Sequence, residues 1–191
     1  MNTPAHLTFG LAAFGRPGAA GITAAALLGA LLPDLSLYLL AGWELGLRGT
    51  DPETVFREMY YSDAWQRIFA VDNSIPLWGV VLAAGLALRR PWVAVLAGAA
   101  LLHLVFDLAL HHDDARRHFW PLSDWVFVSP VSYWDPAHHG RIVGILEIAA
   151  VAALTALIWL RFREIWVRAA AALLLLAETA PLVIWEWMFA A

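Results

Sequence analysis

Three side chains near the middle of the chain, His103, Asp107 and His111, follow one another at intervals of four residues. In an α-helix each such step rotates by roughly 40°, so the three side chains would line one face. Imidazole nitrogens and carboxylate oxygens are ligands of zinc and manganese, and the chain has no cysteine to supply thiolates. We therefore predict a divalent metal site, with zinc favoured and manganese as the alternative. The other interpretation is a hydrogen-bonded His103–Asp107 pair that joins helices without metal.

Further ionisable residues lie in or beside apolar segments and are expected at the same membrane half. If successive helices cross in alternation, the helix ends that carry these residues meet on the side away from the arginine-rich turns. An unpaired carboxylate in hydrocarbon costs about 3 kcal/mol, and a shared cation would offset this cost for several groups at once. The predicted metal ligands are His6, Asp34, Asp72, His103 and Asp107. An interfacial role for His6 and a packing role for Asp34 are the alternatives.

The polar residues that follow this segment are candidates for catalysis and substrate binding. We expect His111 or Asp114 to accept a proton from an attacking water molecule, and Arg116 and Arg117 to bind an anionic head group. Other polar residues fit a functional or a structural role about equally well, or fit a loop better: His112, Asp113, His118, His138, His139, Glu147, Glu178 and Glu186.

The elements that must position these residues are strongly apolar. Hydrophobic residues make up 61% of the 191 residues, and the mean hydropathy is +0.66, which is typical of a membrane protein. The formal net charge of -4 provides no basic surface, so we predict no nucleic-acid partner. The expected fold is all-α, a polytopic transmembrane helical bundle with five to six helices, forming a single integral membrane domain over residues 1–191.

Apolar stretches bounded by arginine, proline or aromatic residues predict the individual helices. These stretches are residues 5–14, 19–41, 74–88, 92–110, 142–160 and 166–189. The first is too short to cross alone, because a span needs roughly 20 residues. Residues 43–73 are predicted to form an interfacial amphipathic segment, and residues 111–140 a structured loop.

The short arginine-rich connections predict the orientation. Arg16, the Arg89–Arg90 pair and the Arg161–Arg163 turn fall on one side if every helix crosses. The positive-inside rule makes that side cytoplasmic, so the predicted site faces the non-cytoplasmic side. The start of the chain carries no arginine ahead of its apolar run, so we expect it to be part of the mature protein and not a signal peptide.

At these positions the sequence resembles the membrane-bound metal-dependent hydrolase family, whose best-known members are LexA-regulated bacterial inner-membrane proteins. The family combines an early histidine, a Leu-Pro-Asp motif, a central polar motif and a His-x-x-x-Asp helix followed by a Trp-Pro segment. The resemblance covers about the first two-thirds of the chain. The matching residues are His6, Leu32-Pro33-Asp34, Asp72-Asn73-Ser74, His103 with Asp107, and Phe119-Trp120-Pro121-Leu122.

The sequence also departs from this family. Many members carry a His-Arg-Gly-x-x-His-Ser motif where this chain has Val71-Asp72-Asn73-Ser74, so two ligand positions differ. The family is distantly similar to zinc-dependent phospholipases C and fungal single-strand nucleases, which cleave phosphoesters with clustered histidines and aspartates. The resemblance implies a hydrolase of the bacterial inner membrane, in contact with membrane lipid, that acts on a phosphoester or lipid-like substrate. A metal-ion or small-solute carrier and a structural scaffold are the non-enzymatic alternatives.

Overall fold

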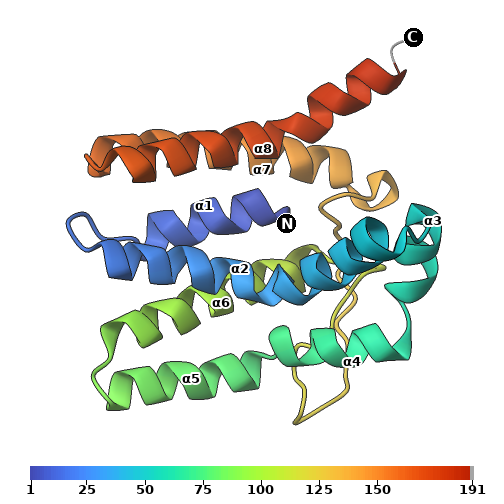
Figure 1. Ribbon diagram of the computed structural model, residues 1–191, viewed down its shortest axis with the longest axis horizontal. Coiled ribbons are helices and arrows are strands. Elements are labelled where there is room, and N and C mark those ends of the chain that lie inside the picture. The colour runs from blue at the N-terminus through green and yellow to red at the C-terminus, as the bar shows by residue number, and fades with distance from the viewer. Residues whose placement is uncertain (190–191) are drawn as a thin grey trace.

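The computed structural model describes residues 1–189, with side chains described up to residue 180. All regular elements among these residues are helices (Figure 1). In chain order they are α1 (Thr3–Phe14), α2 (Ala20–Gly42), η1 (Trp43–Arg48), α3 (Pro52–Thr54), η2 (Val55–Met59), α4 (Asp63–Asp72), α5 (Ile75–Ala87), α6 (Pro91–Leu110), η3 (Pro136–His138), α7 (Gly140–Arg161) and α8 (Ile165–Phe189).

Four helical segments among the described residues are long and apolar enough to cross a membrane. They are Ala20–Arg48, Asp63–Ala87, Pro91–Leu110 and Gly140–Arg161. The predicted all-helical class is thus confirmed, and the four segments suggest a membrane protein by their length and composition, whereas the expected number of five to six helices is not confirmed. The 12 residues of α1 are about 18 Å long, too short to cross a bilayer.

The region after α2 differs most from the sequence prediction. Residues 43–73, expected as one interfacial segment, form four short helices, of which the π-helix η1 continues α2 directly. The last of them, α4, is followed by α5, and together they make one interrupted candidate span. Ser74 begins α5, because its side chain accepts a hydrogen bond from the backbone N–H of Leu77 at 3.1 Å. The interruption at Asn73 and Ser74 lies beside the candidate site.

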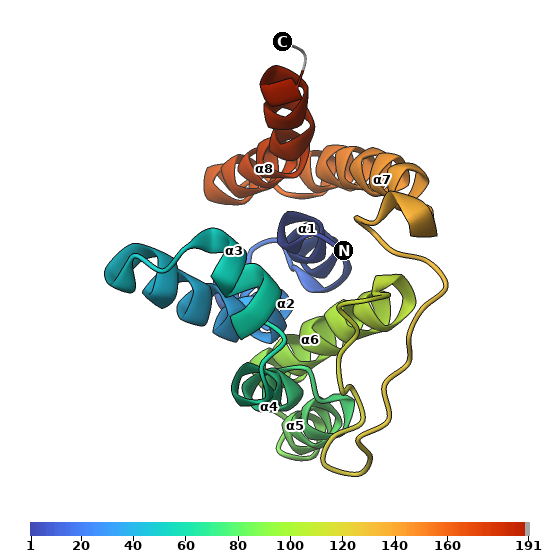
Figure 2. The same cartoon turned by 90° about the vertical axis from the view of Figure 1, so that its right-hand side faces the viewer.

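Helix α1 lies in the centre of the bundle, between the α7–α8 hairpin and the α2–α6 pair (Figure 2). Small residues permit the close approach of these helices. A Cβ atom at Gly29 in α2 would collide with the backbone carbonyl of Leu96 in α6. At Gly10 in α1 a Cβ would lie 2.7 Å from the Cβ of Ala30. These contacts hold the helices that carry His6, Asp34 and His103 against one another.

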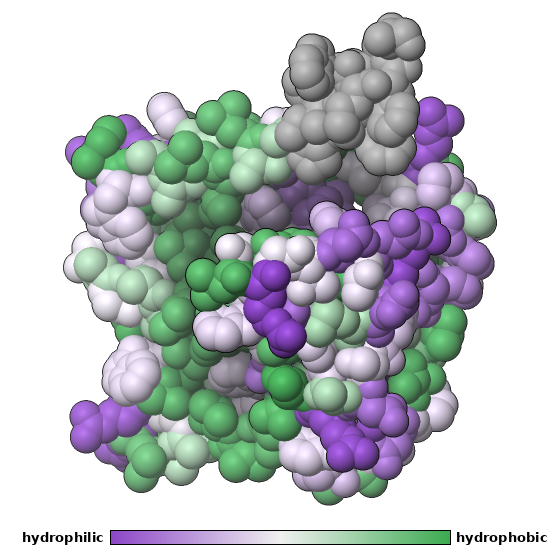
Figure 3. Space-filling view, turned by 45° about the vertical axis from the view of Figure 1, so that its right-hand side comes forward, coloured by the Kyte–Doolittle hydropathy of each residue, from purple (hydrophilic) through white to green (hydrophobic). Residues whose placement is uncertain are grey.

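The surface separates into apolar and polar regions. Hydrophobic residues cover much of the helical body, and hydrophilic residues gather toward the end formed by the segment after α2 and the long loop before α7 (Figure 3). Leucines on the helical surface are strongly exposed, for example Leu160 at 82% and Leu39 at 65%. Exposed leucines of this kind fit a surface that faces hydrocarbon.

Candidate metal centre

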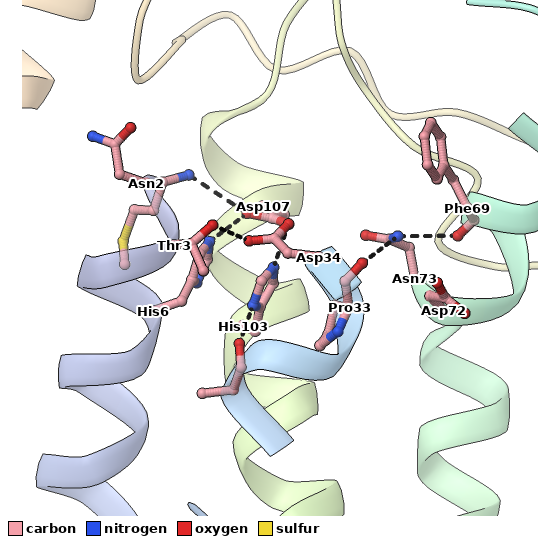
Figure 4. Close-up of polar contacts among 12 residues, drawn as sticks. Asn2, Thr3, His6, Pro33, Asp34, Phe69, Asp72, Asn73, His103 and Asp107 are labelled. Carbon is pink, nitrogen blue, oxygen red and sulfur yellow. Dashed lines mark hydrogen bonds and ion pairs between the residues drawn. The ribbon is translucent and has the colours of Figure 1, made fainter. Parts of the chain in front are cut away.

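The core of the site is formed by His6 of α1 with His103 and Asp107 of α6. Nε2 of His6 lies 2.8 Å from Oδ1 of Asp107, and Nε2 of His103 lies 2.9 Å from Oδ2 of the same carboxylate (Figure 4). The two imidazole rings are stacked with their centroids 3.5 Å apart. Each of the three residues is at most 2% exposed. The predicted i, i+4 arrangement therefore places both α6 side chains inside the bundle, where His6 joins them.

A backbone contact orients His103. Its Nδ1 lies 2.7 Å from the carbonyl oxygen of Ala30 in α2, and this oxygen can only accept a hydrogen bond. Nδ1 therefore carries a proton and donates it to this carbonyl, and Nε2 faces Asp107. A histidine that donates one ring N–H to a backbone carbonyl and directs its other nitrogen inward has the form of a metal ligand.

The donor atoms of these residues fit a divalent cation. Ligand atoms of His6, His103 and Asp107 lie within 4.8 Å of one another. The Nε2 atoms of both histidines are buried and lack a hydrogen bond of acceptable geometry. A buried polar atom without a partner costs about 1–3 kcal/mol, which coordination would remove. Two imidazoles and a carboxylate match the nitrogen and oxygen ligands of zinc sites, so this group can hold a metal ion.

Asp34 lies at the edge of this group. Its Oδ1 is 3.6 Å from Nε2 of His103, and its Oδ2 accepts a hydrogen bond from Oγ1 of Thr3 at 2.5 Å. Tyr38 donates to the same threonine hydroxyl at 2.7 Å. The structure therefore brings Asp34, from the Leu-Pro-Asp motif of α2, close enough to serve as a further ligand after a small side-chain movement.

His111 and Asp114 extend the cluster beyond the end of α6. Nε2 of His111 lies 3.1 Å from Oδ1 of Asp107, and Nδ1 lies 3.1 Å from Oδ2 of Asp114. Burial disfavours the charged imidazole, but the two carboxylates outweigh it and raise the pKa of His111 to about 9. The same contact with His111 lowers the pKa of Asp114 in spite of its burial. This pair can hold and exchange a proton next to the candidate metal ligands.

A cavity of about 200 Å³ adjoins the cluster. Its wall combines the first residues of the chain with residues of α2, α8 and the segments that flank the bundle: Met1, Asn2, Thr3, Pro4, Asp34, Leu37, Tyr38, Tyr60, His111, Arg116, Tyr133 and Ala177. The amino group of Met1 lies 3.5 Å from Oδ1 of Asp107. The cavity thus borders the buried cluster at Asp34 and His111.

The two predicted substrate-binding arginines differ in position. Arg116 is 5% exposed, and its guanidinium carbon lies 4.2 Å from the ring centroid of Phe69 and 4.8 Å from that of Tyr60. Its Nη1 is buried without a hydrogen-bond partner, and the residue lines the cavity. Arg117 instead directs Nη1 toward the exposed Asp124, at 3.8 Å. The structure places a cation in the cavity at Arg116 and not at Arg117.

Asp72 is the predicted ligand that the structure does not bring into the cluster. It lies on α4, beside Asn73 and apart from His103 (Figure 4). The inward residue is Asn73, whose Nδ2 donates to the carbonyl oxygens of Pro33 at 3.1 Å and Phe69 at 3.0 Å. This neighbour therefore fixes the α4–α5 break against the Leu-Pro-Asp motif.

His118, a further candidate from the sequence, lies close to the site in the structure. It is 1% exposed, its Nδ1 lies 3.1 Å from the carbonyl oxygen of Asn73, and its Nε2 is buried without a partner. Burial lowers the pKa of His118, which favours the neutral ring. Ser74, which donates to the carbonyl oxygen of Trp120, helps to hold this loop against α5.

Most of the other weak candidates lie outside the cluster. His112 stacks on His138 at 3.5 Å, and Nδ1 of His138 lies 2.6 Å from Oδ2 of Asp135, within the loop before α7. Glu147 and Glu178 accept hydrogen bonds from the backbone and side-chain nitrogens of Asn2, at 2.6 Å and 3.2 Å. His139 begins α7, Asp113 lies in the loop, and the side chain of Glu186 lies outside the described residues.

Comparison with known proteins adds no assignment to this geometry: no family model matches the chain, and no curated protein or solved structure matches it either.

Proposed function

We propose that this chain is a membrane-embedded metal-dependent hydrolase that acts on a phosphoester or lipid-like substrate. The observation that carries the proposal is the buried group of His6, His103 and Asp107, whose ligand atoms converge and whose two histidine Nε2 atoms lack a hydrogen-bond partner. The adjoining cavity contains Arg116, a buried cation with a free N–H group. A metal site next to a cavity with a positive charge suits a substrate that carries an anionic phosphoryl group.

The residues have separate roles in this proposal. His6, His103 and Asp107 would hold the ion, with Asp34 as a further ligand, and the histidine-rich set favours zinc over manganese. When bound, such an ion supplies Lewis acidity and ionises water near neutral pH.

The side chains around the ion would handle the proton and the substrate. Asp114, whose carboxylate contacts His111, would take up the proton of the attacking water. Arg116 would bind a phosphoryl oxygen by charge-assisted hydrogen bonds and so orient phosphorus in the cavity.

The location follows from the same residues. We infer that the protein resides in a bacterial inner membrane, with the site on the non-cytoplasmic side. The arginines in the α1–α2, α5–α6 and α7–α8 connections lie at the helix ends opposite to the site, and the positive-inside rule puts them in the cytoplasm. Membrane lipid then surrounds the bundle and is the nearest source of phosphoesters.

A carrier for metal ions or small solutes is the second candidate, favoured by the interruption between α4 and α5. Broken spans at binding sites are common in transporters, because the freed backbone groups line a path through the membrane. Here the carbonyl of Asn73 at the break contacts His118. Uptake of zinc by proteoliposomes in the absence of substrate turnover would favour the carrier over the enzyme.

The test compares metal content and hydrolysis in protein purified in detergent. The wild type is expected to retain about one zinc per chain and to hydrolyse bis-p-nitrophenyl phosphate or a short-chain phospholipid. Asp107→Ala should lose both properties. Asp72→Asn is the matched control, because this aspartate lies outside the cluster, and it should keep both. A wild type that binds less than one ion per chain, or an Asp107→Ala variant with full activity, would refute the proposal.

A further inference from the structure

A second and larger hollow, of about 680 Å³, lies where α1 faces α6 and α7. Its wall contains Phe9, Ala12 and Ala13 of α1, Leu102 of α6, and the last two turns of α7 from Leu154 to Arg161. No residue of the candidate metal centre belongs to it. The volume lies within the range of roughly 300–1,000 Å³ that is usual for ligand cavities. We call this hollow the α1–α7 groove.

The groove arises from the shortness of α1 and from its small side chains. Helix α6 packs against α2 and α5, and α7 packs against α8, while α1 contacts both groups. Alanines at positions 12 and 13 leave space that larger side chains would fill. Both α6 and α7 are candidate membrane spans, so in a bilayer the groove would face hydrocarbon and not water.

Arg161 places a positive charge at one end of this apolar surface. Its Nη1 donates to the carbonyl oxygen of Ala12 at 2.7 Å, and its Nη2 donates to that of Gly15 at 2.6 Å. These bonds leave further guanidinium N–H groups free, since the side chain has five donors. Among the residues with described side chains, no carboxylate forms an ion pair with Arg161. Both hydrogen bonds go to carbonyls at the C-terminal end of α1, and the guanidinium carbon lies 5.4 Å from the ring centroid of Phe162, so the charge has favourable contacts but no carboxylate partner.

We propose that the α1–α7 groove binds one acyl chain of an anionic phospholipid whose phosphate contacts Arg161. The apolar wall suits the acyl chain, and a guanidinium with free N–H groups and no carboxylate partner suits the phosphate. A free phosphate ion would leave the groove unfilled, and a neutral lipid would leave the arginine unpaired. Arg161 ends α7, whereas the metal cluster lies near the other end of the bundle. The bound lipid is therefore distinct from a substrate at the metal centre, and it would hold α1 against α7.

Native mass spectrometry of the full chain in detergent, with equal amounts of phosphatidylglycerol and phosphatidylcholine of the same acyl chains, tests this site. The wild type should retain one phosphatidylglycerol and prefer it about fivefold, the effect of one arginine near a charged head group. Arg161→Gln should abolish this preference. Arg163→Gln removes an exposed arginine of the same turn outside the groove, and it should behave like the wild type.

Ala13→Phe fills the groove without touching the hydrogen bonds of Arg161, so it carries the test even if Arg161→Gln fails to fold. It should lose the retained lipid of either class. Equal retention by Ala13→Phe and the wild type would overturn the proposal. An equal loss of lipid preference in Arg163→Gln would also overturn it, because it would indicate diffuse surface charge. A dimer that buries the groove and excludes lipid would overturn it as well.

Discussion

The replacement of Asp107 by asparagine separates a metal centre from a purely structural ion-pair cluster. Asparagine keeps the shape of the side chain but removes the charge that faces the imidazoles of His6, His103 and His111. Loss of one partner from a buried charged group costs about 3–5 kcal/mol, so the metal-free variant should be less stable under both interpretations. The two interpretations differ in how zinc changes the stability.

A ligand that binds only the folded state at 100 times its dissociation constant stabilises the protein by about 2.7 kcal/mol. For a chain of this size that corresponds to a rise of roughly 5–10 °C in the midpoint of thermal unfolding. We expect this rise for the wild type in detergent with zinc, no rise for Asp107→Asn, and the full rise for Asp72→Asn. The midpoint is measured by tryptophan fluorescence. A folded wild type whose midpoint is the same with and without zinc or manganese would refute the metal assignment.

Three further variants test the packing, the loop and the cavity. Gly29→Ala should destabilise the protein by about 1–3 kcal/mol in thermal unfolding, because its Cβ would collide with the carbonyl of Leu96. Asp135→Asn should remove an acid-sensitive contribution to stability. The contact with His138 lowers the pKa of Asp135 below the ordinary 3.8. The contribution of Asp135 to stability is therefore complete above pH 3.8 and is lost as the pH falls through the lowered pKa. Arg116→Gln should raise KM for an anionic phosphoester more than it lowers kcat, measured by steady-state kinetics.

Each of these variants has a matched control. Gly21→Ala places its Cβ in open space and should leave the stability nearly unchanged. Thermal unfolding of wild type and Asp135→Asn should converge at low pH, and parallel curves from neutral to acidic pH would contradict the proposed contact. Arg117→Gln changes an arginine that faces Asp124 instead of the cavity, so its KM should equal that of the wild type. An equal effect of both arginine variants would contradict a specific role for Arg116.

Helical periodicity was sufficient to predict the α6 part of the site. Three side chains at four-residue spacing must share a face, and the structure places His103, Asp107 and His111 together at the buried cluster. The alternation of helices also predicted that His6 and Asp34 would reach the same end. These predictions succeed because they depend on helix geometry and on the cost of charge in an apolar layer, and both hold however the helices of the bundle pack.

The contribution of the α4–α5 break could not be predicted in the same way. Asp72 and Asn73 are adjacent, and on a helix adjacent residues point about 100° apart, so a small error in phase exchanges the inward and outward residues. The phase is set by the end of α4, by the Ser74 cap and by contacts of Asn73 with α2. These are tertiary contacts that one sequence does not reveal. His118 depends likewise on how the loop after α6 folds back onto Asn73.

The short helix α1 links the site to the stability of the whole bundle. It contributes His6, and it contacts α2, α6, α7 and α8, while Arg161 of α7 binds the carbonyls at its C-terminal end. A helix too short to span the bilayer has little reason to insert by hydrophobicity alone, so its position depends on these contacts and on what His6 binds. Metal bound at His6 and lipid bound at Arg161 would both favour the docked position of α1, and each would then strengthen the binding of the other. A zinc affinity that is unchanged by anionic lipid would show that α1 is held firmly without either ligand.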